Sequence, residues 1–444
     1  MDYSFDNRFY ANALVRRDYS SRFGRDNRGA TFWAVGGKWN LTHESFIESD
    51  DITDLNLKVS YGTQGNAAIG NYNSLGLIGT TTDYAEKQSW VLAQPSNNAL
   101  QWEKQGLLTV ALTGRLLDRI NFDLQYYDRK TSNMLMSVPY PYTAGFDEQY
   151  SNVGSLQNRG LDVTLSIDVF RTNDAYFTVS GTFNYNIEKI TELFNGLQEW
   201  TVPSTGLTYV VGKPVSFYYP IYAGVNPENG APTWYMPYGY EDYLASVEAG
   251  NPDTGLIDMN RTRMDPNAVT EDYNEDLLLQ NTGHKLNAPI NGGFSFAGGW
   301  KGLSMRADFT YVADKWLISN DYYFLANPVV VAGYNQAKEA SDFWTPTNTN
   351  AYYPDWSKYS MEFDSHLLMP ASFLRLKNLQ IGYNLPASLF KWQNVVKSIQ
   401  LTFTGRNLLT FTKFKGVDPE VDGNLIRNLP GNTKQILGGV EIRF

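Results

Sequence analysis

Apolar and polar residues alternate along several stretches of the chain, in the pattern of antiparallel strands with two different faces. The clearest example lies within residues 372–411, where two alternating runs flank a short turn that contains Pro386. Because successive side chains of a strand point to opposite faces of its sheet, this stretch predicts a hairpin with one apolar face and one polar face. A single hairpin of this kind also suits a soluble sheet, so the interpretation depends on how often the unit recurs.

The same pattern recurs along the whole chain and predicts about twelve strands. Their approximate ranges are 9–17, 31–41, 55–61, 107–115, 120–126, 161–168, 177–187, 290–300 and 303–311, two within 372–411, and 435–444. In the tenth strand the apolar phase changes near Lys377 and Asn378, which predicts a β-bulge there.

The connections between these strands alternate in length. Long connections are followed by short or moderate ones along the chain, whereas a soluble sandwich has no reason to keep all its long loops on one side. Outer-membrane barrels combine short turns on one side with long loops on the other. The pattern therefore favours an all-β fold of the transmembrane antiparallel β-barrel type.

A barrel of this type has a lipid face and a lumen face. We expect apolar strand residues to face lipid, namely Phe122, Leu165, Val179, Phe183, Leu401 and Phe403. We expect polar residues between them to face the lumen, namely Asp123, Thr164, Asn184 and Thr402.

Composition narrows the class further. Aromatic residues make up 15% of the 444 residues, yet the mean hydropathy is only −0.38. No apolar run reaches the ~20 residues of a membrane-spanning helix, so the sequence does not suit a helical membrane protein. A β-barrel wall has an apolar residue only at every second position, so the mean hydropathy does not exclude a membrane location. The net charge of −10, without a basic cluster, argues against nucleic acid as a partner. The chain has no Cys, which excludes disulfides and cysteine metal sites.

Candidate catalytic and metal-binding residues are few. The three histidines, His43, His284 and His366, are far apart and lack the spacing of a metal site. Acidic pairs at 271–272 and 275–276 suit solvated loop charge better than hydrolase carboxylates. No nucleotide-binding or hydrolase motif is present, so we expect no enzymatic activity.

One short segment imitates the start of a calcium-binding loop. Its acids are Asp418, Glu420 and Asp422, but Leu429 occupies the twelfth position, where an EF-hand needs a bidentate acid. We therefore expect no cofactor, and a looser calcium site is the alternative.

Trp and Tyr concentrate in the two longest connections, which precede the strands near 290 and 372. Aromatic faces can stack on sugars while polar neighbours orient hydroxyl groups, so these loops are the expected region of substrate or partner contact. The alternative is that the aromatics hold the loops together. The candidate contacts are Trp200, Tyr219, Trp234, Tyr235, Trp344 and Trp356.

Two segments of the sequence also resemble a known family. FLRLKNLQIGYNLP, at 373–386, and TFTGRNLLTFTKFKGVDPE, at 402–420, are similar to the closing hairpins of SusC/RagA-type TonB-dependent transporters of Gram-negative outer membranes. Further segments resemble the family in the same order, from NALVRRDYSSRFGRDNRGATFWAVGGKW at 12–39 onward.

The resemblance implies an outer-membrane importer of glycans or oligosaccharides, or of peptides. It also implies a SusD-like surface lipoprotein as partner and energy supplied by the TonB complex. Such barrels have about 22 strands around a plugged lumen. Residues 1–444 are therefore expected to be the C-terminal part of the barrel, without the plug and the N-terminal strands. The alternatives are a soluble all-β glycan-binding or structural protein and, third, a secreted hydrolase.

Overall fold

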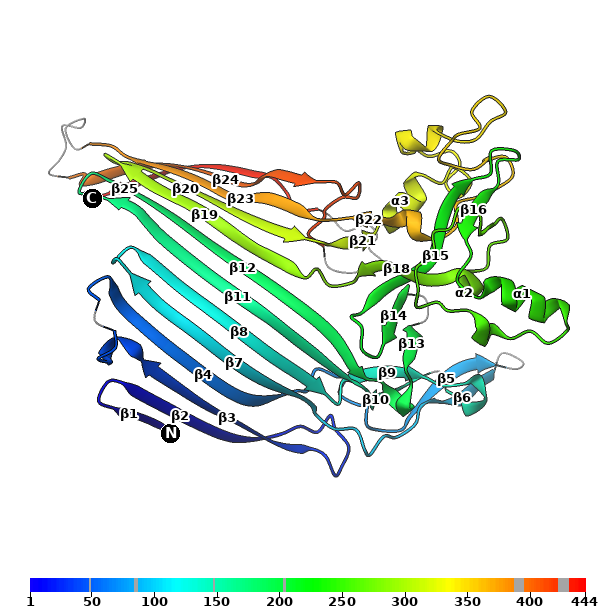
Figure 1. Ribbon diagram of the computed structural model, residues 1–444, viewed down its shortest axis with the longest axis horizontal. Coiled ribbons are helices and arrows are strands. Elements are labelled where there is room, and N and C mark those ends of the chain that lie inside the picture. The colour runs from blue at the N-terminus through cyan, green and yellow to red at the C-terminus, as the bar shows by residue number, and fades with distance from the viewer. Residues whose placement is uncertain (48, 84–86, 147, 203–204, 387–394, 422–430) are drawn as a thin grey trace. The chain divides into compact units, whose positions relative to one another are not determined.

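The computed structural model (Figure 1) describes residues 1–47, 49–83, 87–146, 148–202, 205–386, 395–421 and 431–444. Strands make up 54% of it and helices 9%, which confirms the all-β prediction. The chain forms two compact units. The first comprises residues 1–200, 210–214 and 294–301, and the second comprises residues 201–209, 215–293 and 302–444.

An antiparallel ladder of eight strands dominates the first unit. In ladder order these are β1 (Asp2–Phe5), β2 (Phe9–Tyr19), β3 (Gly29–Asn40), β4 (Ile52–Asn66), β7 (Glu103–Leu116), β8 (Ile120–Ser132), β11 (Ser155–Arg171) and β12 (Ala175–Glu192). Most of β19 (Ile290–Trp300) belongs to the same unit.

Strand β1 is absent from the sequence-based prediction, which begins its first strand at residue 9. The structure pairs β1 with β2 through a tight turn in which Asp6 and Asn7 both have a φ of 52°. Asp and Asn tolerate this left-handed conformation better than most residues, and turns of this hand match the twist of a hairpin. With β1, the described part of the chain has thirteen wall strands, one more than the twelve expected.

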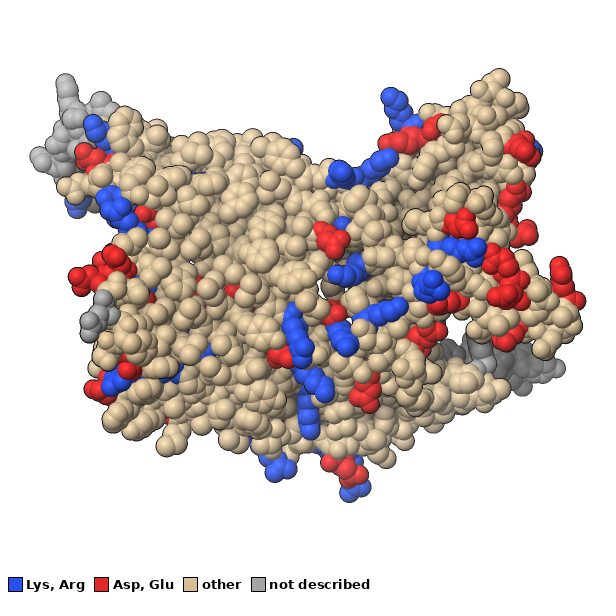
Figure 2. Space-filling model, in the orientation of Figure 1, with Lys and Arg blue, Asp and Glu red and all other residues tan. Residues whose placement is uncertain are grey.

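The predicted alternation of faces is confirmed by the strand register. Leu165 lies opposite Phe122 on one face, while the neighbouring Thr164 lies opposite Asp123 on the other face. The apolar face is not buried beneath protein, since the Leu165 residue is 39% exposed. On the face shown in Figure 2, charged residues are sparse over the strands and gather toward their ends and over the loops. This is the arrangement of a barrel wall that meets lipid.

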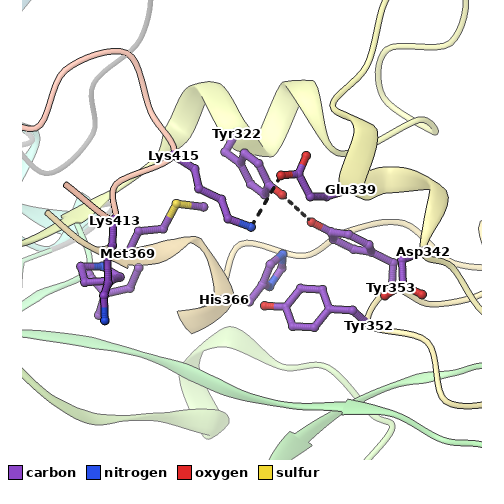
Figure 3. Close-up of a pocket in the computed structure, with 11 residues that line it drawn as sticks. Tyr322, Glu339, Asp342, Tyr352, Tyr353, His366, Met369, Lys413 and Lys415 are labelled. Atoms are coloured by element: carbon purple, nitrogen blue, oxygen red, sulfur yellow. Dashed lines mark hydrogen bonds and ion pairs between the residues drawn. The ribbon is translucent and has the colours of Figure 1, made fainter. Parts of the chain in front are cut away.

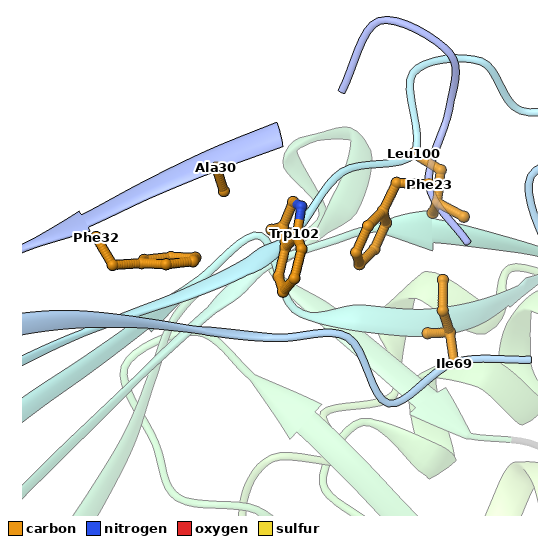
Figure 4. Close-up of a cluster of buried hydrophobic side chains, with 6 residues drawn as sticks. All are labelled: Phe23, Ala30, Phe32, Ile69, Leu100 and Trp102. Atoms are coloured by element: carbon orange, nitrogen blue, oxygen red, sulfur yellow. The ribbon is translucent and has the colours of Figure 1, made fainter. Parts of the chain in front are cut away.

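The long connections of the first unit form smaller hairpins, β5 (Leu77–Asp83) with β6 (Lys87–Gln94) and β9 (Leu135–Pro139) with β10 (Glu148–Asn152). A buried cluster at the loop ends of β3, β4 and β7 packs around Trp102 (Figure 4). The Trp102 ring lies 4.9 Å from that of Phe23, and its Nε1 donates to the Arg28 carbonyl at 3.0 Å. The cluster fixes how these connections leave the wall.

The second unit contains four further wall strands, β20 (Leu303–Ala313), β23 (Phe373–Asn384), β24 (Ser398–Thr412) and β25 (Gln435–Arg443). The register skips Lys377, between Leu376 and Asn378 of β23, when β23 pairs with β24. The pairing of β23 with β20 shifts at the same place. The predicted bulge is thus confirmed.

The same unit contains most of the loop structure. Its short strands are β14 (Leu207–Val210), β15 (Ser216–Val225), β16 (Pro232–Tyr235), β17 (Val269–Thr270), β18 (Leu279–Lys285), β21 (Trp316–Ile318) and β22 (Leu368–Pro370), and β13 (Glu199–Val202) lies where the two units divide. Its helices are α1 (Tyr240–Glu248), α2 (Glu275–Leu278) and α3 (Asn320–Leu325). No helix in the described residues is long and apolar enough to cross a membrane.

Candidate functional site

The two longest connections pack against each other within the second unit and form one body, which we call the loop body (residues 215–289 and 314–372). The backbone N–H of Tyr222 donates to Ser365 Oγ at 3.0 Å. The N–H of Asp355 donates to the Gly230 carbonyl at 2.9 Å. Both contacts join residues more than a hundred positions apart, so each connection orders the other.

Trp234, one of the predicted contact residues, lies at the centre of this body. Its side chain is fully enclosed, at 1% exposure, and its Nε1 donates to Asp364 Oδ2 at 2.7 Å. The Tyr273 ring packs 4.8 Å away, and the Tyr273 hydroxyl donates to the Phe363 carbonyl. Trp234 therefore ties β16 to the segment before β22.

Trp344 and Trp356 also make contacts within the loop body. Nε1 of the buried Trp344 donates to the Pro227 carbonyl at 3.1 Å. Nε1 of the half-buried Trp356 donates to the Ala340 carbonyl at 3.1 Å. These bonds satisfy the polar end of each indole, as buried tryptophans require.

The remaining candidates differ in burial. Tyr219 is buried in β15, donates its hydroxyl to the Thr205 carbonyl at 3.3 Å, and has its pKa raised by that burial. Tyr235 is half-buried at the end of β16. Trp200 belongs to the first unit, where its ring packs 5.1 Å from that of Phe194.

Five of the six candidates therefore lie in the loop body, and Trp200 belongs to the first unit. The burial of Tyr219, Trp234 and Trp344 favours the alternative that these three hold the loops together. Contact with substrate or partner stays a prediction for all six residues, and it is sterically easier at the partly exposed Trp200, Tyr235 and Trp356.

A cavity of about 530 Å³ opens in the second unit beside this body (Figure 3). Its walls come from three segments: the connection after β20, strand β22, and the residues that follow β24. The lining residues are Tyr322, Glu339, Asp342, Tyr352, Tyr353, His366, Leu368, Met369, Pro370, Lys413 and Lys415.

His366 lines this cavity and is held by a carboxylate behind it. Its side chain is 5% exposed, and its Nδ1 is hydrogen-bonded to Asp364 Oδ1. The backbone N–H of His366 donates to the same oxygen at 2.9 Å, and Trp234 binds the other oxygen. Among the described residues, His366 Nε2 has no hydrogen-bond partner.

Aromatic rings surround the imidazole. The ring of Tyr222 lies 5.0 Å from it, and those of Tyr352 and Tyr353 each lie 6.4 Å away. Tyr353 and Tyr322 share a hydrogen bond of 3.0 Å between their hydroxyl groups. Burial raises the pKa of Tyr352 to about 12.

Sequence reasoning missed this cavity. Its lining residues are spread from 322 to 415, so no short sequence motif indicates that they lie together. The sequence interpretation assigns no metal site to His366, because a lone histidine without a second ligand at short spacing gives no metal signal.

The acids of the segment that resembles a calcium-binding loop form ion pairs with an arginine. The carboxylates of Asp418 and Glu420 bind the guanidinium of Arg375, and the N–H of Asn432 donates to Asp418 Oδ2 at 2.7 Å. Their oxygens therefore accept from N–H donors, and the described residues contain no group of acids or histidines arranged for a metal. Residues 422–430 lie outside the described residues.

The acidic pairs of the loop also have structural contacts. Glu271 accepts from the side-chain amides of Asn226 and Asn229. Glu275 and Asp276 occupy the first turn of α2, where negative charge suits the helix N-terminus. These contacts agree with their interpretation as loop charge.

No family model matches the chain, but it is similar to several known TonB-dependent receptors. The chain is 28% identical over 455 residues to TonB-dependent receptor P26 of Formosa agariphila, covering 98% of this chain and 43% of the receptor. It is 26% identical over 468 residues to TonB-dependent receptor SusC of Bacteroides thetaiotaomicron, covering 100% of this chain and 43% of SusC.

Among solved structures, the chain is similar to that of the RagAB peptide transporter. The TM-score is 0.87 at 38% identity, over 99% of this chain and 46% of that chain. This chain therefore spans less than half the length of the relatives it matches. The relatives are receptors and transporters, not enzymes.

Proposed function

We infer the function from the premise that this chain is a SusC/RagA-like part of a TonB-dependent β-barrel of the outer membrane. The protein imports oligopeptides across that membrane. The observation that supports peptides is the 38% identity to the RagAB peptide transporter, against 25–28% to the curated TonB-dependent receptors.

The assembly follows from the same premise. Residues 1–444 supply the C-terminal part of the barrel wall and the loop body, while a plug and further strands complete the transporter. A SusD-like lipoprotein covers the loop side, and TonB supplies energy from the inner membrane. The wall strands and long loops described above suit this division, since binding in the loops leaves the wall unchanged.

Glycan import is the second candidate. Two observations favour it, namely the resemblance to the SusC/RagA family, which implies glycans as well as peptides as cargo, and the concentration of Trp and Tyr in the loop body. Aromatic faces serve sugars and apolar peptide side chains alike, so the loops do not separate the two.

Uptake of labelled substrates tests the proposal. Cells that express the full-length transporter should accumulate labelled oligopeptides, and an isogenic strain without TonB should not. Accumulation of neutral oligosaccharides without any peptide uptake would replace peptide import by glycan import.

Alanine substitutions then test the six aromatic candidates. A few anchors usually dominate such contacts, so alanine at one or two of Trp200, Tyr235 and Trp356 should lower uptake sharply at unchanged surface expression. Alanine at the buried Tyr219, Trp234 or Trp344 should instead raise protease sensitivity of the loop body. If all six variants bound substrate and lipoprotein like the parent protein, the contact assignment would be wrong.

A further inference from the structure

We propose that the cavity lined by His366, which we call the His366 cavity, is a subsite that binds the terminal carboxylate of a peptide. The proposal rests on the peptide import inferred above and assigns one part of the substrate to one part of the loop body. Three features support it: an unpartnered imidazole nitrogen, two lysines, and an apolar wall.

The imidazole nitrogen is the first feature. Buried polar atoms in folded proteins nearly always have a hydrogen-bond partner, so an enclosed nitrogen without one points to an occupant. His366 Nε2 is such an atom among the described residues, and it belongs to a side chain that lines the cavity. Figure 3 places the imidazole between Tyr352, Tyr353 and the two lysines.

Asp364 determines what this nitrogen can bind. Its carboxylate accepts from the His366 Nδ1–H, which keeps that nitrogen protonated and fixes the orientation of the ring. Asp364 is itself held by Trp234, so the ring cannot turn without breaking a buried bond. In the imidazolium form both ring nitrogens are donors, so Nε2–H can donate to an anion while Nδ1–H donates to Asp364.

The lysines supply the remaining positive charge. Lys413 and Lys415 line the cavity from the segment after β24. Lys415 Nζ lies 3.8 Å from Glu339 Oε1, with both side chains about half exposed, so this ion pair is weak and leaves the ammonium accessible. The other acid of the lining, Asp342, accepts from the Asn348 side chain at 3.3 Å.

The wall of the cavity suits an uncharged side chain. Its uncharged lining consists of Leu368, Met369 and Pro370 together with the rings of three tyrosines. A volume of about 530 Å³ falls within the range of small-ligand sites. It accommodates the last one or two residues of a peptide, with the side chain on the apolar wall and the carboxylate among His366, Lys413 and Lys415.

A pair of peptides tests the subsite. Binding to the detergent-solubilised full-length transporter is measured by calorimetry for one transported peptide with a free C-terminal carboxylate and for the same peptide with a C-terminal carboxamide. The variants are His366→Gln and Lys415→Gln, and the matched controls are His43→Gln and Lys434→Gln, which lie outside the cavity. Lys415 is exposed, so its variant keeps the fold even if His366→Gln does not.

The free acid should bind at least tenfold more tightly than the carboxamide, because charged hydrogen bonds to a carboxylate are replaced by weaker ones. His366→Gln and Lys415→Gln should each weaken the free acid about tenfold and change carboxamide binding little. The control variants should match the parent protein for both peptides.

The outcomes separate the subsite from the function. If a protein that imports peptides bound the free acid and the carboxamide equally well, the subsite would be wrong and peptide import would stand. The same conclusion would follow if only a structural water bound His366 Nε2. If uronic-acid oligosaccharides bound in a His366-dependent way and peptides did not bind at all, both the subsite assignment and peptide import would be wrong.

Discussion

Neighbouring residues of a wall strand have opposite surroundings. In β11, Leu165 lies on the apolar face opposite Phe122, and Thr164 lies on the polar face opposite Asp123. The same alternation continues into β12, whose Phe183 lies opposite Val163 of β11. The consequence of a substitution therefore depends on which of two adjacent positions receives it.

Lysine at these adjacent positions tests the lipid face. Leu165→Lys should lower the free energy of unfolding by about 2 to 4 kcal/mol, because the ammonium then lies in hydrocarbon. Thr164→Lys adds the same charge to the same strand but on the lumen face, so its effect should be small. Denaturant unfolding in lipid vesicles measures both variants. Equal destabilisation by the two lysines would contradict the assignment of faces.

At the scale of elements, a buried ion-pair network joins β23 to the connection that follows β24. Arg375 Nη2 lies 2.6 Å from Asp418 Oδ1, and the two side chains are 4% and 3% exposed. Lys377, at the bulge, binds Glu420 from the same side. Burial opposes the charge on Asp418, but hydrogen bonds from Arg375 and from backbone N–H groups outweigh it and hold the pKa of this carboxyl below its usual range.

Removing the arginine should detach this connection. Arg375→Met leaves a buried carboxylate without its cation, which typically costs about 3 to 5 kcal/mol. The double variant Arg375→Met/Asp418→Asn removes the stranded charge as well and should recover part of the loss. Protease sensitivity of residues 413–434 and thermal unfolding measure both. Wild-type behaviour of the single variant would show that the network contributes little.

The pH dependence follows from the direction of the shift. Since the pKa of Asp418 is lower in the folded protein than in the unfolded chain, its stabilisation is present above the unfolded value of about 3.9 and is lost as the pH falls through the folded value. The stability difference between wild type and Arg375→Met should therefore shrink in acid.

At the scale of the whole molecule, the two edge strands of the large sheet determine whether these residues can form a stable barrel by themselves. Among the described strands, β1 pairs with β2 alone and β25 pairs with β24 alone. Backbone N–H and C=O groups of an edge strand have no hydrogen-bond partner in hydrocarbon, so membrane barrels have to close.

These residues expressed by themselves should therefore aggregate or be degraded. The measurement is refolding of residues 1–444 into detergent or vesicles, followed by electrophoresis with and without heating, beside the full-length transporter as control. A stable monomer whose mobility changes on heating would contradict the prediction that further strands complete the barrel.

The sequence by itself determined twelve of the thirteen wall strands of the described residues, their faces, the bulge at Lys377 and the alternation of short and long connections. All of these depend on residues close together in the chain, because the period of a strand is two and a turn spans a few residues. The wall strand that the sequence did not predict is β1. Its four residues are too few for a periodic pattern, and it is a strand because it pairs with β2.

Tertiary structure alone decided the roles of the loop residues. Burial of Trp234 depends on Asp364, which is 130 positions away, and the partners of Trp344 and Tyr222 are equally remote. Composition identified the aromatic loops but not which rings hold the loops together. His366 had no signal in the sequence at all, because an unpartnered nitrogen is a property of its surroundings. Only packing of the two connections enclosed that ring beside a cavity and left one of its nitrogens without a hydrogen-bond partner among the described residues.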